Sequence, residues 1–447
     1  MKTRYALILI LLMAGCAELP EARMSEPIPV PGRTSPLSRR TVPFQEDRLH
    51  LKPVDGSLSG LLGLVDASPA LEALKHEISR EAGTAIQGSL SPNPVLGFET
   101  EMMPFDDPGF GKARNKIRLS QRIEVAGKAK SRVEIALANK DEAEAKFYSE
   151  RATLLTQTAR DYYKIVYAGF GEEYAQRLLD LRKTVLERAQ ELNATGRISE
   201  KDLIPYRVEL HQAEVRLKSF QAEKRKTLRN LEGRLGLKAE TIQACTGQRC
   251  VQPIALSMER AENDILSLNP SLIVLDRKVA AALARRDAAD SKAYPDLNVG
   301  VSYVRGFNQR MERDDFFGAF VELPFPLVDR NQGGIQAADA DIRMAESDLL
   351  AAGYRLIDEW HGLVEERQVM LEQREIYSHQ IELLRQEQAL IDQQVEAGRE
   401  SIFKLLQVRI RIEEAELLDL ALEEKLVLLN TDLLNLTGRN LNPACQG

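Results

Sequence analysis

The chain has few aromatic residues and few histidines. Aromatic residues make up 6% of its 447 residues, with a single tryptophan. None of the five histidines lies at a spacing typical of metal ligands, and there is no nucleophile triad and no phosphate-binding glycine loop. The composition therefore argues against a thick globular core, and the missing motifs argue against an enzyme or a bound cofactor.

Long hydrophobic runs are also missing. After Met13, no apolar stretch approaches the ~20 residues that a membrane helix needs. Any membrane crossing is therefore expected to use strands or a lipid. The net charge of -7 gives no reason to expect a nucleic-acid partner.

An export signal is predicted at the start of the chain. Lys2 and Arg4 precede an apolar run that ends in Leu-Met-Ala-Gly-Cys at Cys16. Residues 1–15 resemble a bacterial lipoprotein signal, and the resemblance implies that Cys16 carries the lipid. The alternative is a chance cysteine after an ordinary signal. Residues 16–65 are rich in proline, serine and glycine and are expected to form an extended segment.

Three cysteines follow Cys16. Cys245 and Cys250 lie five residues apart, and in an exported protein a local disulfide between them is a reasonable hypothesis. A metal site is less favoured, because no histidine is near and two thiolates leave a tetrahedral ion half liganded. Cys445 has no obvious partner in the tail, residues 441–447.

The sequence repeats itself at an offset of 202 residues. The aligned pairs include Gly196 and Gly398, Arg197 and Arg399, Leu203 and Leu405, and Gly236 and Gly438. Two homologous halves, residues 66–250 and 251–440, are therefore expected to build one elongated body.

Each half is expected to contain two strands. The ranges are 94–103 and 115–124 in the first half, and 295–305 and 316–324 in the second. The residues alternate, with Leu297, Val299 and Val301 on one face of a strand and polar or small residues between them. Apolar residues outside and polar residues inside suit a membrane barrel, although a soluble sheet also alternates. Because even small barrels need about eight strands, several copies of the chain would have to share one.

Very long helices follow the strands. They are expected at 128–194, 199–236, 331–397 and 400–437, and the two longest would each span roughly 100 Å. Apolar residues repeat every seven positions after the second Gly-Arg turn, which predicts antiparallel coiled coil; they are Val408, Ala415, Leu422, Leu429 and Leu436. Gly196 and Gly398 are expected to take positive φ, and Ser199 and Ser401 to cap the next helices.

Helix lengths suggest which short helices stack end to end, so that each long helix lies beside a column of matching length. The helix at 128–194 is matched in length by 199–235 and 257–292 together, so these two segments are expected to share a column. The helix at 400–437 is shorter than its partner. A helix at 69–87, with Ser68 as its cap and Pro69 in its first turn, is expected to complete that column.

The chain resembles the TolC family of outer-membrane efflux proteins over roughly residues 66–440. The resemblance rests on Asn93-Pro94, the segment Gln121 to Lys128, the segment Pro324 to Gly333 and the two Gly-Arg turns, which are similar to the heavy-metal branch of the CzcC and CusC type. It implies a mostly α fold with a small β part. It further implies a homotrimer with a twelve-stranded barrel in the outer membrane and a periplasmic helical tunnel. The implied partners are a periplasmic adaptor protein and an inner-membrane pump, with the RND type favoured.

The function implied is that of a passive exit channel, with metal cations as the favoured cargo. Two alternatives stay open from the sequence. One is a duct of the same fold for drugs or polypeptides. The other is a periplasmic coiled-coil scaffold lipoprotein whose strands form a soluble sheet.

Charged residues near the turns are the candidate functional residues. The Gly196-Arg197 and Gly398-Arg399 turns are expected to contact the adaptor. Asp202, Asp392 and Glu396 lie close to them, and three copies of a carboxylate around an axis would attract cations or, with the arginines, form a latch. The alternative is that these charges only solvate a face of the coiled coil.

Overall fold

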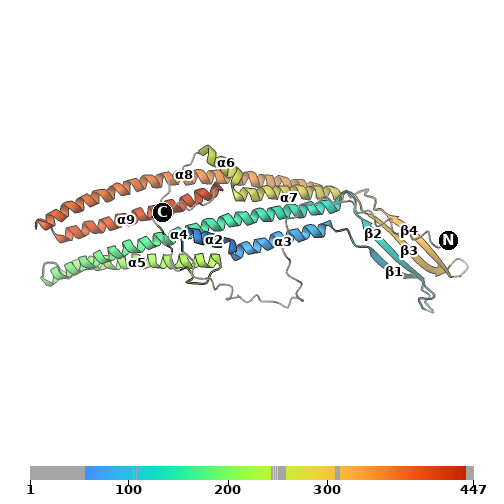
Figure 1. The fold of residues 1–447 in the computed structure, drawn as a ribbon, viewed down its shortest axis with the longest axis horizontal. Coiled ribbons are helices and arrows are strands. Elements are labelled where there is room, and N and C mark those ends of the chain that lie inside the picture. Colours follow the sequence, from blue (N-terminus) through green and yellow to red (C-terminus); the bar gives the residue numbers. More distant parts are fainter. Residues whose placement is uncertain are drawn as a thin grey trace. The chain divides into compact units, whose positions relative to one another are not determined.

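The computed structural model describes residues 56–103, 105–106, 108–242, 245, 247, 249, 258–307 and 313–438. The chain divides into two units, Met1–His50 and Leu51–Gly447, and all described residues belong to the second. The predicted signal, Cys16, Cys250 and the tail lie outside the described residues. In the described part, the fold is mostly helical with one small antiparallel sheet, which confirms the predicted fold class (Figure 1). None of the helices described combines the length and the hydropathy of a membrane span.

The sheet has four strands in the order β1-β2-β3-β4. They are β1 (Val95–Glu101), β2 (Arg114–Ile123), β3 (Leu297–Phe307) and β4 (Arg313–Glu322). In the antiparallel register, Phe98 lies opposite Ile117, Ile117 opposite Tyr303, and Tyr303 opposite Phe317. Opposed residues share a face of the sheet, so this row fixes which side chains lie together. The outer strands β1 and β4 come from different halves of the chain.

Two helical hairpins extend from the sheet. The first is α4 (Lys128–Ala194) with α5 (Glu200–Leu235), and the second is α8 (Gln332–Glu396) with α9 (Ile402–Leu436). The predicted coiled-coil seam is confirmed in the second hairpin, where the buried cluster consists of Ile381, Leu384, Ile391, Leu405, Val408, Ile412 and Ala415. The helices therefore pair through their heptad positions.

A short helix precedes this body in a segment that the sequence predicts to be extended. Leu58–Leu64 forms α2, and Val65–Ala67 continues it as a 3-10 turn, η2. The Ser57 hydroxyl accepts a hydrogen bond from the Gly60 N–H at 3.2 Å, which begins the helix. Leu61 and Val65 are fully buried, and α2 packs against α4. Burial of these apolar side chains explains why the segment is not extended throughout.

The expected assignment of the columns is wrong. Helix α3 (Pro69–Ser89) follows the end of α5, and α7 (Pro270–Lys292) follows the end of α9; α6 (Met258–Leu268) precedes α7 (Figure 1). A Cβ atom on Gly236 would lie 2.9 Å from Cδ of Pro69, and the Asn269 amide donates to the carbonyl of Leu436. Each short helix therefore completes the column of its own half of the chain, because the contacts at the helix ends, and not lengths, select the partner.

The four hairpin helices lie in the order α5, α4, α9, α8. Helix α4 packs against both α5 and α9, and α9 packs against α8. Ion pairs join α4 to α9, including Arg177 Nε to Glu413 Oε2 at 3.1 Å and Arg182 Nη2 to Glu414 Oε1 at 2.9 Å. This order leaves α5 and α8 on opposite edges of the chain (Figure 1).

Candidate functional site

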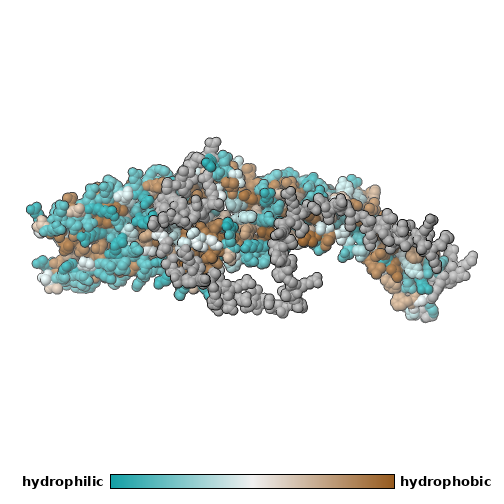
Figure 2. All heavy atoms as spheres, viewed as in Figure 1, coloured by the Kyte–Doolittle hydropathy of each residue, from teal (hydrophilic) through white to brown (hydrophobic). Residues whose placement is uncertain are grey.

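One face of the sheet exposes large apolar side chains. Leu96 is 73% exposed and Phe317 is 85% exposed, and the register places both on the face that also holds Ile117, Leu119 and Val301. Hydrophobic residues gather at this end of the chain, whereas the surface near the helical turns is mostly hydrophilic (Figure 2). An exposed apolar sheet face of this kind suits contact with lipid or with another protein.

The opposite face of the sheet carries charge pairs. Lys116 Nζ lies 3.0 Å from Glu99 Oε2, and Arg118 Nη2 lies 2.6 Å from Glu322 Oε1. The Arg118 guanidinium also lies over the Phe320 ring, 3.9 Å from its centroid. Arg118 reaches from β2 across β3 to β4, where Gly300 leaves room for the Phe320 ring. This face therefore holds fixed charges of both signs.

The first helical turn joins α4 to α5 through Gly196. This glycine has a φ of 71°, and the Arg197 N–H donates to the Leu192 carbonyl at 2.9 Å, which closes the helix end. Ser199 then begins α5, and its hydroxyl and N–H both donate to Asp202 Oδ2, at 2.7 and 2.9 Å. These two hydrogen bonds lower the pKa of the Asp202 carboxyl. Asp202 therefore caps the helix, a role that the Ser-x-x-acid pattern of the sequence could have indicated.

The second turn has the same backbone but different charges. Gly398 has a φ of 70°, and the Arg399 N–H donates to the Gln394 carbonyl at 2.8 Å. Ser401 caps α9 by accepting from the Phe403 N–H at 3.2 Å. Lys404 occupies the position that Asp202 holds in the first half, and its amine lies 2.8 Å from Glu400. The two turns are therefore equivalent in shape and distinct in charge, and both predicted glycine conformations and serine caps are confirmed.

The candidate carboxylates of the second hairpin differ from each other. Asp392 Oδ1 lies 3.5 Å from Arg409 Nη2 of α9, so this pair joins the two arms of one hairpin. Glu396 is exposed on the last turn of α8. Among the described residues, Glu396, Arg197 and Arg399 have no ion-pair partner within 4.0 Å. The suggested latch between these arginines and Asp392 or Glu396 is thus not formed within the described part of one chain.

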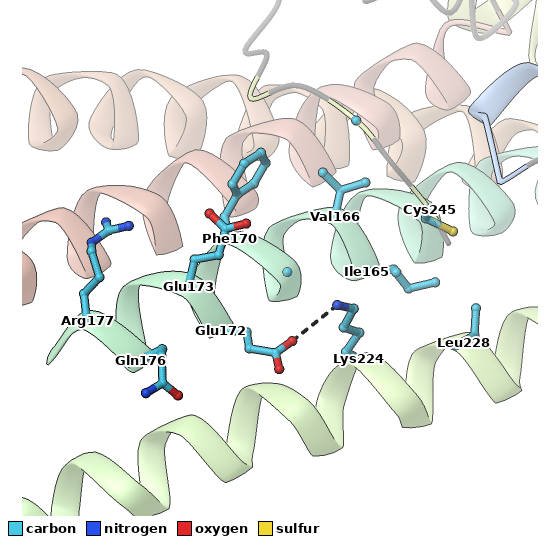
Figure 3. A pocket seen from close by; sticks show the side chains of 12 residues that line it. Ile165, Val166, Phe170, Glu172, Glu173, Gln176, Arg177, Lys224, Leu228 and Cys245 are labelled. Atoms are coloured by element: carbon cyan, nitrogen blue, oxygen red, sulfur yellow. Dashed lines mark hydrogen bonds and ion pairs between the residues drawn. The ribbon is translucent and has the colours of Figure 1, made fainter. Parts of the chain in front are cut away.

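Cys245 lines a cavity of about 770 Å³ beside α4 and α5 (Figure 3). Ile165, Val166, Phe170 and Leu228 supply apolar walls, and Glu172 pairs with Lys224 at 3.3 Å. Burial raises the pKa of the Cys245 thiol to about 11, although Lys224 opposes the shift. Because Cys250 lies outside the described residues, the disulfide between them stays a prediction.

Sequence reasoning missed a partly buried ionic cluster, which we call the Arg249 cluster: Tyr174, Arg249, Arg374, Asp419 and Glu423. Arg249 Nε donates to Glu423 Oε2 at 2.8 Å, and Arg249 Nη2 donates to Asp419 Oδ2 at 3.0 Å. Glu423 is 3% exposed. The sequence gives one hint of this cluster, which is the presence of two acids, Asp419 and Glu423, inside an apolar helix. Their partners lie far away in the sequence, so the hint does not identify them. No group of three or more His, Cys, Asp or Glu residues in the described ranges is arranged to hold a metal ion.

Comparisons with known proteins agree with this geometry. A family model described as "Outer membrane efflux protein" matches residues 69–237 and 262–439. The cobalt-zinc-cadmium resistance protein CzcC of Cupriavidus metallidurans is 25% identical over 274 residues, which cover 60% of this chain and 62% of that relative. The match thus spans less than two thirds of the relative's length.

Solved structures share the fold. CusC is similar with a TM-score of 0.68 at 16% identity, over 87% of this chain and 94% of that one. The MtrE outer membrane channel of Neisseria gonorrhoeae, in its open state, is similar with a TM-score of 0.70 at 14% identity, over 88% of this chain and 92% of that one. At such identities the likeness concerns the fold alone.

Proposed function

Because the chain belongs to the outer membrane efflux protein family, we propose that it forms the outer-membrane exit duct of a tripartite efflux system. The observation that carries the proposal is the two-faced sheet. One face is apolar and exposed, the other holds charge pairs, and the sheet continues into helices of 65 and 67 residues. A sheet of this kind has the pattern that a barrel needs when lipid lies outside it and water inside.

In the proposed assembly three copies share one barrel. The four strands of one chain are too few to close, since barrels need about eight, whereas three copies supply twelve. Strand β4 of one copy then pairs with β1 of the next, so that no edge stays open. The long hairpins continue the barrel as a tunnel into the periplasm, and a lipid on Cys16 anchors each copy to the membrane.

The duct itself performs no chemistry in this proposal. Energy comes from an inner-membrane pump, with the RND type favoured, and a periplasmic adaptor connects pump and duct. The turns at Gly196-Arg197 and Gly398-Arg399 are the proposed adaptor contacts. Two observations support this choice. Backbone hydrogen bonds fix the shape of both turns, and the arginine side chains of both turns are exposed.

Metal cations are the proposed cargo. The likeness to a cobalt-zinc-cadmium resistance protein supports this choice. Carboxylates near the turns, Glu396 and Asp392, would attract cations to the end of the tunnel that the turns form. Glu396 is the stronger candidate, because Arg409 already offsets the charge of Asp392.

A transport experiment tests the proposal. A bacterial strain that lacks such a duct would receive this chain together with an RND-type metal pump and the adaptor of that pump. We expect the complete set to raise the concentrations of zinc, cobalt and cadmium that the cells survive, and the set without this chain to leave them unchanged. Resistance to drugs with no change for metals would favour the alternative cargo. No change for any cargo, with the protein present in the outer membrane, would contradict the duct.

A further inference from the structure

The two connections that lead from the sheet into the longest helices differ in length and in character. Residues 124–127 connect β2 to α4, whereas residues 323–331 connect β4 to α8. The first connection is tied to its helix by charge, because Arg132 Nη1 lies 2.6 Å from Glu124 Oε1. The second is more than twice as long and begins with Leu-Pro-Phe-Pro-Leu-Val at residues 323–328, which we call the junction segment. The internal repeat therefore does not account for the junction segment.

The junction segment exposes four large apolar side chains. Phe325, Leu327 and Val328 are between 72% and 84% exposed, and Leu323 is 53% exposed. Leu323 and Phe325 continue the two-residue spacing of Val321, which lies on the apolar face of β4. The junction segment therefore extends that apolar face beyond the end of the sheet.

Hydrogen bonds and prolines hold the segment in this shape. The Leu327 N–H donates to the Phe325 carbonyl at 2.9 Å, and Arg330 Nε donates to the Pro326 carbonyl at 3.3 Å. Pro324 and Pro326 each have a backbone φ that the proline ring fixes. The segment is therefore closed by its own polar groups while its apolar side chains stay exposed.

Basic and aromatic side chains flank the junction segment. Arg330 and Lys292 are exposed, and neither has a carboxylate within 4.0 Å among the residues that the structure describes. Lys292 ends α7, which lies beside the start of α8, because the Asn331 side-chain amide donates to the Ala289 carbonyl at 2.7 Å. Tyr294 follows α7 and is 59% exposed. Apolar side chains beside a tyrosine and bases are typical of the boundary between a membrane and water.

A neighbouring copy is the other candidate for covering this segment. In the proposed barrel, β4 borders β1 of the next copy, and residues 82–98 lead into that strand and form its first part. These residues contain no Asp or Glu, so they offer no carboxylate to Arg330 or Lys292. Phospholipids carry a phosphate group at the surface of each leaflet. Charge therefore favours lipid over a second chain.

We propose that the junction segment of each copy embeds in the periplasmic leaflet of the outer membrane, with Arg330 and Lys292 at the phosphate groups of its phospholipids. The inference rests on the proposed duct, in which the helices leave the sheet toward the periplasm. Because only the second half of the chain carries the segment, three copies place three such contacts around one barrel. These contacts set the depth at which the barrel lies in the membrane.

Tryptophan substitutions test the contact in the full-length protein, reconstituted into phospholipid vesicles. Phe325→Trp and Leu327→Trp report on the junction segment, and Phe317→Trp reports on the apolar face of the sheet. Tyr148→Trp is the matched control, because Tyr148 is 64% exposed but lies on α4, about 30 Å from the start of that helix. Every variant keeps Trp360, which is fully buried, so the native protein gives the background.

Phospholipids that carry bromine on their acyl chains quench a tryptophan that touches them. After subtraction of the background, we expect the two junction variants to lose at least half as large a share of their fluorescence as Phe317→Trp. Tyr148→Trp should lose none. Bromine near the head group should quench Phe325→Trp more strongly than bromine near the end of the chain, because the segment lies at the surface of the leaflet.

The outcomes separate this inference from the duct itself. Quenching of Phe317→Trp without quenching of the two junction variants would overturn the lipid contact and leave the duct standing, and a neighbouring copy would then be what covers the segment. No quenching in any of these three variants would overturn both the contact and the proposed duct.

Removal of the two bases gives a second, independent test. Native mass spectrometry counts the phosphatidylglycerol molecules that stay bound when the protein leaves its detergent. The variant that combines Arg330→Gln with Lys292→Gln should retain fewer of these lipids than the native protein. The control combines Lys218→Gln with Lys226→Gln, at two exposed bases of α5, and should retain as many as the native protein. Equal retention by the two variants would contradict the phosphate contact of Arg330 and Lys292.

Discussion

The side-chain amide of Asn269 donates a hydrogen bond to the backbone carbonyl of Leu436, 2.9 Å away. Asn269 is the N-cap of α7, and its Oδ1 also accepts from the Ser271 N–H at 2.9 Å. Leu436 is the last residue of α9. A single side chain, only 4% exposed, therefore ends one helix of the column and begins the next.

Replacing Asn269 by Ala should destabilise the column. The variant loses the cap of α7 and leaves the buried Leu436 carbonyl without this donor, which together should cost about 1–3 kcal/mol. The midpoint of thermal unfolding in detergent reports the loss. Ser68→Ala is the matched comparison, because Ser68 caps α3 at the same place in the other column but accepts one hydrogen bond, at 3.4 Å. Equal losses for the two variants would contradict the joint role of Asn269.

The Cys245 thiol should react slowly with alkylating reagents in the native protein. Its pKa is raised from 9.0 to about 11, so below pH 9 the thiolate fraction is about 100-fold lower than in the unfolded chain. The native rate should still rise with pH between 9 and 11, where the unfolded rate levels off. Cys250→Ser with Cys445→Ser isolates this thiol for measurement by mass spectrometry. A native rate that levels off near pH 9 would contradict the raised pKa.

Much of the fold follows from the sequence, and the reasons are local. Heptad spacing around Val408 and Ala415 predicts the seam of the second hairpin, and the glycines at 196 and 398 predict the turns. Alternation in β3 predicts a two-faced sheet. These features depend on residues that are close together in the sequence or repeat at a fixed period.

Other features depend on contacts between distant segments. Helix lengths assign the short helices to the wrong columns, because the contact of Pro69 with Gly236 and the bond from Asn269 to Leu436 decide the matter. The Arg249 cluster joins three helices and the segment after α5, so no local pattern shows it. Asp202 stays a candidate tunnel charge, and the structure adds a local role for it as a helix cap.

Glu396 should influence ion selectivity more than Asp392. Arg409 partly offsets the charge of Asp392, whereas Glu396 has no ion-pair partner in the described part of the chain. In planar bilayers, Glu396→Ala should reduce the preference for cations over anions, and Asp392→Ala should reduce it less. Gln393→Ala, at an uncharged and exposed neighbour on α8, serves as the control. Unchanged selectivity in both carboxylate variants would show that these groups do not line the path of the ions.

Two neighbouring phenylalanines on β4 test which face of the sheet meets lipid. Phe317 lies on the apolar face and is 85% exposed, whereas Phe316 lies on the face with the charge pairs. Phe317→Arg should cost about 2–4 kcal/mol near the middle of the membrane, and Phe316→Arg much less. The amount of heat-stable, membrane-inserted protein on a gel measures the difference. Equal tolerance of arginine at both positions would contradict the assignment of the faces.

The number of chains in one particle decides whether copies of the chain share a barrel. The protein would be extracted from membranes in detergent and its mass measured by native mass spectrometry, with the detergent removed in the instrument. We expect three chains per particle, because three four-stranded sheets are needed for the proposed barrel. A particle with one chain or two would contradict the shared barrel and the exit duct with it.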